Sequence, residues 1–88
     1  MKKKIMPPLH PGEILMEEFI IPLGLNRSRL ADELSVPRNR ITQIVKGTRE
    51  ITADTALRLS HYFGTTPEFW MNAQAHYNLE LARDSVGE

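Results

Sequence analysis

Residues 27–46, with the sequence RSRLADELSVPRNRITQIVK, restrict the fold more than any other part of the chain. They read as two short helices joined by a tight turn. Small or apolar residues stand where such a pair of helices needs them, at Ala31, Val36, Ile41 and Ile44. A unit of this shape is a helix-turn-helix, whose second helix can lie in the major groove of DNA. The stretch therefore predicts a shape and, with it, a function.

The second helix of this unit carries polar residue types that are suited to reading DNA bases. Arginine can pair with O6 and N7 of guanine, asparagine or glutamine with N6 and N7 of adenine, and threonine can contact a thymine methyl group. The residues that we expect to read bases are Arg38, Asn39, Arg40, Thr42 and Gln43. Those that we expect to hold phosphates, at the start of the first helix and after the second, are Arg27, Ser28, Lys46, Thr48 and Arg49.

The distribution of charge supports this interpretation, although the net charge of the 88-residue chain is zero. Residues 26–49 hold six basic and two acidic residues, a net charge of +4, whereas residues 50–88 hold two basic and six acidic residues, a net charge of −4. These polar residues can also be read as the solvated faces of a helical bundle. A basic patch confined to one segment of a neutral protein favours DNA instead, because a local patch is enough to attract a polyanion.

Proline, glycine and capping residues divide the chain into five expected helices and no strand, which predicts an all-α fold. We expect residues 1–10 to form an N-terminal arm, residues 11–84 a single folded domain and residues 85–88 a tail. Within the domain, the helix-turn-helix unit covers about residues 26–47 and the last helix about residues 67–83. A domain of this size buries only a modest core, so tight helix packing or a dimer partner would help it.

Local signals set several helix boundaries and one unusual backbone position. Pro11 and Pro37 suit the first position of a helix, where the missing N–H would be unpaired in any case. Ser35 is expected in the left-handed conformation, at a cost of about 1–2 kcal/mol for a residue other than glycine. Asn26, Thr52 and Thr66 are expected to cap the second, fourth and fifth helices. We predict that the inner side of that helix consists of Ala53, Ala56, Leu57 and Phe63.

Several other functions have little support in the sequence. The chain has no cysteine, which excludes disulfides and thiolate metal sites. His10, His61 and His76 do not stand at metal-ligand spacing, and there is no glycine-rich phosphate loop. We therefore expect no metal, no cofactor and no enzymatic activity. No apolar run suits a signal peptide or a membrane span, so we expect a cytoplasmic protein without a membrane partner.

Three segments together resemble one family. They are LHPGEILMEEFIIPLGL, the helix-turn-helix, and ITADTALRLSHYFGTTPEFWMNAQAHYNL, which with the order of the helices cover about residues 9–82. This pattern resembles the HigA-type antitoxins, a branch of the lambda-repressor-like (XRE) transcription regulators. The resemblance implies a five-helix lambda-repressor-like DNA-binding domain. It also implies a repressor that binds the promoter of its own operon as a dimer and silences a small HigB-type toxin, a ribosome-dependent ribonuclease.

The last predicted helix is apolar on two sides, which suggests a second neighbour in addition to its own bundle. One stripe consists of Trp70, Ala73, Tyr77 and Leu81. The other, which we expect to form a homodimer interface, consists of Met71, Ala75, Leu79 and Ala82. A two-fold dimer places its recognition helices about 34 Å apart, which predicts an operator that is an inverted repeat.

Three alternatives to the antitoxin remain at this point. The chain is also consistent with a stand-alone regulator of the same DNA-binding class, without a toxin partner. A protein–protein inhibitor with vestigial DNA binding is disfavoured by the basic residues gathered in the recognition unit, and an enzyme has no sequence support. Charge alone suggests that acidic residues of the C-terminal half face a basic ribonuclease. The candidates are Glu68, Glu80 and Asp84.

Overall fold

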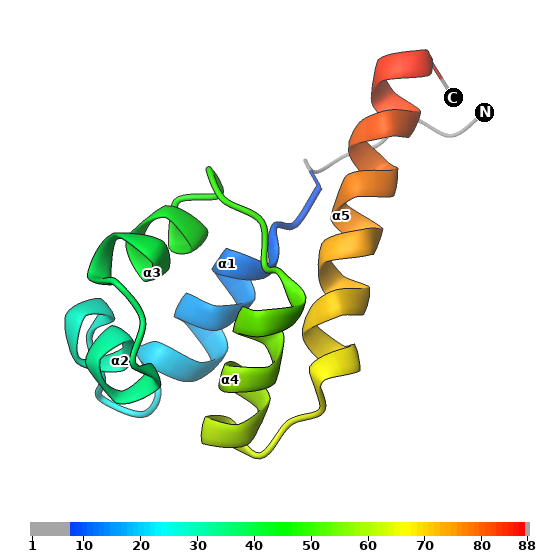
Figure 1. Ribbon diagram of the computed structural model, residues 1–88. Coiled ribbons are helices and arrows are strands. Elements are labelled where there is room, and N and C mark those ends of the chain that lie inside the picture. The colour runs from blue at the N-terminus through cyan, green and yellow to red at the C-terminus, as the bar shows by residue number, and fades with distance from the viewer. Residues whose placement is uncertain (1–7, 88) are drawn as a thin grey trace.

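The helices follow one another in the order that the sequence predicts (Figure 1). The computed structural model describes residues 8–87, so that residues 1–7 of the expected arm lie outside the described part. The elements are α1 (Pro11–Ile14), which continues into the π-helical segment η1 (Leu15–Ile20), then α2 (Arg27–Leu34), α3 (Arg38–Val45), α4 (Ala53–Phe63) and α5 (Pro67–Val86). No strand occurs among the described residues, and the all-α prediction is confirmed.

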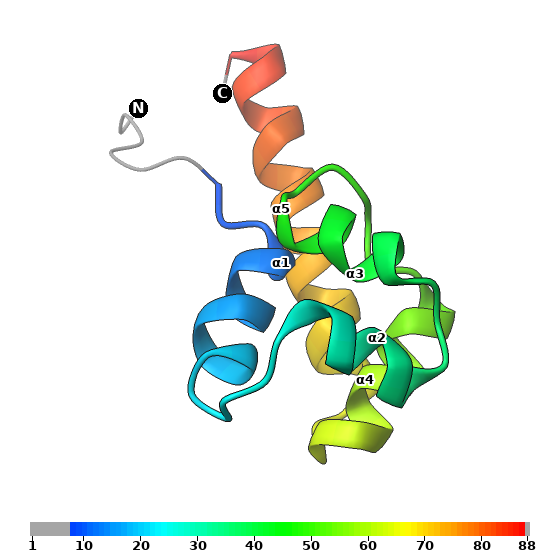
Figure 2. The same cartoon turned by 90° about the vertical axis from the view of Figure 1, so that its left-hand side faces the viewer.

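α1 and α4 lie between the helix-turn-helix and the last helix. α1 contacts α3 and α5, while α4 contacts α2 and α5. The C-terminal half of α5 projects beyond the other helices, as both views of the ribbon show (Figure 1, Figure 2). The bundle therefore packs against only one end of its longest helix.

The core is built from apolar residues of η1, α2, α3, α4 and α5 and of the segments between them. Trp70 of α5 is fully buried, and its indole Nε1 donates a hydrogen bond to Thr65 Oγ1 at 2.8 Å. The ring of Phe19 lies 5.1 Å from that of Trp70 and 4.8 Å from that of Phe63, measured between centroids. The buried apolar residues are Leu15, Ile20, Leu30, Ala31, Leu34, Val36, Ile41, Ile44, Ile51, Ala56, Leu59 and Trp70.

Capping side chains begin three helices where the sequence predicts them. The backbone N–H of Arg29 donates to Asn26 Oδ1 at 2.7 Å, and Thr52 and Thr66 cap α4 and α5 in the same way. Pro37 differs slightly from the prediction, because it is the residue before α3 and not its first residue. The last helix is longer than predicted, since it continues to Val86 and so includes the first two residues of the expected tail.

α4 buries a different side from the one predicted. Ala56 is buried and Phe63 is half-buried, but Ala53 and Leu57 are exposed. The other buried positions of the helix are Thr55, Leu59 and Ser60. Ser60 can be buried because its hydroxyl donates to the carbonyl of Leu57 at 2.9 Å, which satisfies the polar group. A search for apolar residues alone cannot find such a position.

His10 and Gly12 join the start of α1 to the rest of the bundle. The buried His10 caps α1, because its Nδ1 accepts a hydrogen bond from the backbone N–H of Gly12 at 2.9 Å. Its ring packs edge-on against that of Tyr77 on α5, with 4.7 Å between centroids. Gly12 lies so close to the carbonyl of Ile44 that a Cβ atom would clash with it. Glycine at this position therefore allows α1 to approach the end of α3.

Candidate nucleic-acid interface

The turn between α2 and α3 has the geometry that the sequence predicts. Ala31 is fully buried, and Val36 fills the corner with 8% of its surface exposed. Ser35 is left-handed, with φ at 59°, and ends α2. Ile41 and Ile44 are fully buried and fix one side of α3 in the core. The opposite side of α3 is consequently free to meet a ligand.

The residues predicted to read bases lie on this free side with different degrees of exposure. Arg38 and Asn39 are exposed at the start of the helix. Arg40, Thr42 and Gln43 are half-buried. The structure therefore brings Arg38, Asn39, Thr42 and Gln43 to the accessible side of α3, whereas Arg40 lies at its border with α4.

Arg38 forms an ion pair across the turn with Asp32 of α2. Its Nη2 lies 2.9 Å from Asp32 Oδ2, and its Nε donates to Oδ1 at 3.3 Å. This hydrogen bond lowers the pKa of Asp32 below its usual value, and the carboxylate raises the pKa of Arg38. Asp32 occupies the edge of the guanidinium formed by Nε and Nη2. The edge that includes Nη1 remains available for the two acceptors of a guanine.

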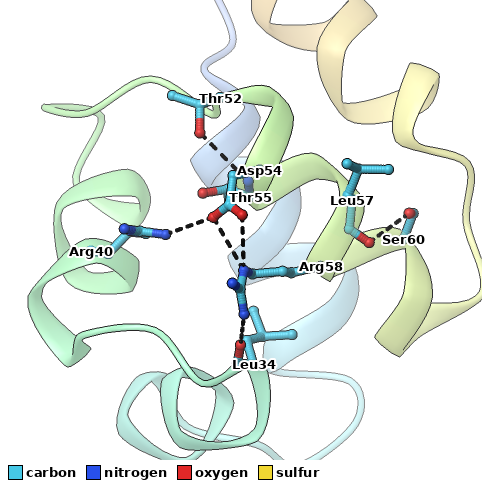
Figure 3. Close-up of polar contacts among 8 residues, drawn as sticks. All are labelled: Leu34, Arg40, Thr52, Asp54, Thr55, Leu57, Arg58 and Ser60. Atoms are coloured by element: carbon cyan, nitrogen blue, oxygen red, sulfur yellow. Dashed lines mark hydrogen bonds and ion pairs between the residues drawn. The ribbon is translucent and has the colours of Figure 1, made fainter.

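Arg40 is directed at α4 instead (Figure 3). Its Nη1 donates to Asp54 Oδ2 at 3.0 Å, and the same carboxylate accepts two hydrogen bonds from Arg58 Nε, at 3.1 and 3.2 Å. Arg58 Nη1 also donates to the carbonyl of Leu34 at 2.8 Å. The sequence did not reveal this network, because its members come from three helices.

The residues predicted to hold phosphates lie at both ends of the recognition unit. Arg27 and Ser28 are exposed in the first turn of α2, while Lys46, Thr48 and Arg49 are exposed after α3. Within the described part of the chain, no carboxylate pairs with Arg27, Lys46 or Arg49. Two uncompensated positive groups thus follow α3, and one precedes it at the start of α2.

Two buried polar residues that the sequence analysis missed support the loop between α3 and α4. Gln74 of α5 is 3% exposed, and its Oε1 accepts a hydrogen bond from the backbone N–H of Ile51 at 2.8 Å. Its Nε2 donates to Asn78 Oδ1 at 3.1 Å. On the other side of the loop, the ring of His10 lies beside Gly47, so close that a Cβ atom at this glycine would be in van der Waals contact with it. The loop that carries the expected phosphate contacts is therefore held from two sides.

The outer face of α5 remains uncovered. The predicted dimer residues Met71, Ala75, Leu79 and Ala82 are all exposed. In the other stripe, Trp70 is buried, Ala73 and Tyr77 are half-buried, and Leu81 is exposed. Of the acidic candidates, Glu68 and Asp84 are exposed, whereas Glu80 is half-buried and pairs with Arg83 at 3.1 Å.

The described residues also bear on metal binding and on membrane insertion. No group of three or more histidine, aspartate or glutamate side chains in residues 8–87 is placed to hold a metal ion. None of the described helices is both long enough and apolar enough to cross a membrane.

Helices α2 and α3, with a left-handed turn and a polar outer face on the second helix, define a helix-turn-helix DNA-binding protein. The sequence profile described as "Helix-turn-helix" matches residues 16–70. An uncharacterized HTH-type transcriptional regulator of Haemophilus influenzae is 47% identical over 72 residues, which cover 82% of this chain and 67% of the relative. The antitoxin HigA-1 of Vibrio cholerae is 38% identical over 88 residues, which cover 100% of this chain and 83% of the relative.

Solved structures of related proteins have the same fold. An addiction module antidote protein of the HigA family from Coxiella burnetii is 51% identical, with a TM-score of 0.88 over 93% of this chain and 89% of that one. The Pseudomonas aeruginosa antitoxin HigA, solved with the higBA promoter, is 42% identical, with a TM-score of 0.88 over 91% of this chain and 87% of that one. The chain belongs to the helix-turn-helix family and, within it, to the HigA-type antitoxins.

Proposed function

We propose that this protein is an antitoxin that represses its own operon by binding an operator in the promoter. The observation that carries the proposal is the arrangement of the recognition unit: polar residues suited to reading bases lie on the free side of α3, and basic residues without a carboxylate partner lie after α3 and at the start of α2. Arg38, Asn39, Thr42 and Gln43 read base edges in the major groove. Arg40 does not join them, because its guanidinium is turned toward α4. The protein acts in the cytoplasm, where the operator DNA of its bacterial relatives lies, and has no catalytic role.

The phosphate contacts of this proposal fix the position of α3 in the groove. They come from Arg27 and Ser28 before the recognition helix and from Lys46, Thr48 and Arg49 after it. Such contacts supply affinity for any sequence, whereas the contacts to base edges supply the discrimination between sequences.

Homodimer formation through α5 completes the operator-binding unit. The exposed stripe of Met71, Ala75, Leu79 and Ala82 meets its copy across a two-fold axis. The two recognition helices then reach half-sites about one DNA turn, or roughly 34 Å, apart. The operator is consequently an inverted repeat.

Substitutions on α3 test the DNA part of the proposal. Arg38→Ala and Gln43→Ala should each cost about 1–3 kcal/mol of discrimination between the operator and a mismatched operator, because each removes one bidentate base contact. Fluorescence anisotropy with promoter fragments measures this loss. Arg83→Ala, which removes a basic residue of α5, is the matched control. Unchanged discrimination in both α3 variants would contradict the placement of α3 in the groove.

The toxin partner is tested by co-expression with the product of the adjacent small reading frame. A stable complex that restores growth supports the antitoxin, with a small HigB-like ribonuclease as its partner. In that complex, charge reversal at Glu68, Glu80 and Asp84 should weaken binding if the acidic half of the chain faces the toxin. An undiminished affinity would reject that surface.

A stand-alone transcription regulator is the second candidate function. It is favoured by the relative in Haemophilus influenzae, which is named only as a transcriptional regulator. Tight binding to an inverted repeat in the chain's own promoter, with no complex in the co-expression experiment, would select this candidate.

A further inference from the structure

A single carboxylate connects the three helices of the DNA-binding half of the molecule (Figure 3). Asp54 lies in the first turn of α4 and accepts hydrogen bonds from Arg40 of α3 and Arg58 of α4. Arg58 in turn donates to the carbonyl of Leu34, the last residue of α2. Asp54 thus joins the recognition helix to α4 and, through Arg58, to the end of α2.

Arg40 differs from Arg38, the other arginine of α3, in its exposure and in its partner. The side chain of Arg40 is 26% exposed, against 66% for Arg38. Arg38 is paired with α2 within the helix-turn-helix, whereas Arg40 is paired with a helix outside it. The Asp54 carboxylate is additionally favoured at its position by the positive end of the α4 dipole. Arg40 is therefore held by a partner that the fold itself places there.

The geometry points to Asp54 as a positioning residue for operator recognition, an inference that rests on the proposed function. Its carboxylate keeps Arg40 turned toward α4 and away from DNA, while the other polar residues of α3 face the groove. A released guanidinium beside the groove would contact phosphates of any sequence. Asp54 therefore lowers the affinity for random DNA and increases the preference for the operator.

The salt dependence of binding tests this role. Asp54→Asn keeps the size of the side chain but removes its charge, so that Arg40 is free to neutralise a phosphate. The slope of log K against log salt concentration should become steeper by about 0.9 for each subunit bound. The ratio of operator affinity to random-DNA affinity should fall in the same variant. A purely structural role would lower thermal stability without steepening the slope.

A double-variant comparison separates release of Arg40 from a general change of charge. Asp54→Asn is made in the natural background and in an Arg40→Met background. The steeper slope should appear only where Arg40 is present. Glu18→Gln, which changes the net charge by the same amount on η1, should leave the slope as it is. An equal effect of Asp54→Asn in both backgrounds, or no effect in either, would overturn the inference.

The same set of variants distinguishes a folding defect from a failure of the proposed function. The Asp54 side chain is 57% exposed and exposed ion pairs contribute little to stability, so Asp54→Asn should fold, which its circular dichroism melt checks. If Asp54→Asn does not fold, Asp54→Ser, which also removes the carboxylate, is used in its place. If the natural protein fails to prefer the operator over random DNA, the proposed function is wrong. If the natural protein prefers the operator and the slopes do not change, only the role of Asp54 is wrong.

Discussion

Every large apolar side chain between Leu30 and Ile44 is buried, whereas α5 leaves five of its own exposed. The helix-turn-helix has thus placed its apolar groups inside the domain and presents polar and charged groups to solvent. The exposed surface of α5 presents the opposite chemistry. The large apolar residues exposed on α5 are Phe69, Met71, Leu79, Leu81 and Val86.

This difference separates two kinds of partner on one small domain. A surface of uncompensated cations and amides suits a polyanion, and its binding does not require further burial of apolar groups. Exposed apolar side chains suit another protein chain, because water is displaced when they are covered. The contrast also runs along α5 itself, since its buried residues, Trp70 and Gln74, both lie in its N-terminal half.

The largest expected effect comes from removing the residue that docks α5 on the bundle. Trp70→Ala should lower the free energy of unfolding by about 3–5 kcal/mol, because it leaves a large cavity beside Phe19 and Thr65. Denaturant unfolding measures the loss. Leu57→Ala, at an exposed position of α4, is the control and should change stability by about 0.5 kcal/mol or less. Equal effects of the two changes would mean that α5 is not fixed by its N-terminal half.

The second-largest expected effect is on dimer formation through the exposed stripe of α5. Leu79→Glu should raise the dimer dissociation constant by about tenfold or more, equivalent to about 1.4 kcal/mol, because it puts a charge into an apolar interface. Sedimentation equilibrium gives the constant. Leu57→Glu is the matched control, since Leu57 is 58% exposed and Leu79 is 50% exposed. A dimer that withstands Leu79→Glu but not Leu57→Glu would move the interface from α5 to α4.

A smaller effect is expected in the turn of the helix-turn-helix. Ser35→Gly should raise the free energy of unfolding by about 1 kcal/mol, because glycine adopts the left-handed conformation without steric cost. Thermal or denaturant melts detect the gain. Ser28→Gly in the right-handed helix α2 should have the opposite sign, by about 0.5–1 kcal/mol. A loss of stability at Ser35 would show that its hydroxyl matters more than its backbone conformation.

The smallest expected effect comes from His10, which lies beside Gly47 after α3 and packs against Tyr77 of α5. Burial lowers the pKa of His10 below 6.5, although the charges of Glu13 and Glu50 oppose the shift. The folded state therefore favours the neutral ring, so this contribution to stability is present above pH 6.5 and is lost as the pH falls below it. Unfolding free energies on both sides of that pH reveal the loss. His10→Asn, which can still cap α1 but does not titrate, should weaken the pH dependence. If the pH dependence of stability is unchanged in this variant, groups other than His10 cause it.

The sequence predicted the parts of the fold that depend on neighbours along the chain. The caps Asn26, Thr52 and Thr66 and the left-handed Ser35 are local features, since each follows from the residue and its position at a helix end. No local signal predicted the π-helical segment η1, and the structure offers no physical account of it.

Contacts between distant segments were the part that the sequence did not reveal. The pairs of Arg38 with Asp32 and of Arg40 with Asp54 depend on how three helices are oriented, so the count of charges made both arginines look equally available. His10 and Gln74 were missed for another reason. A hydrophobic pattern assigns polar residues to the surface, yet these two are buried because each satisfies a backbone N–H.

The hydrogen bond from Ile51 to Gln74 restrains the loop between α3 and α4. Ile51 lies outside every helix, but its amide can open only if Gln74 Oε1 gives up a buried partner. The segment that carries Thr48 and Arg49 is thereby joined to the same cooperative unit as the core, although loops commonly open on their own. Local opening of this loop then requires much of the free energy of opening the α4–α5 contact, so the residues expected to contact phosphates are held in place before DNA binds.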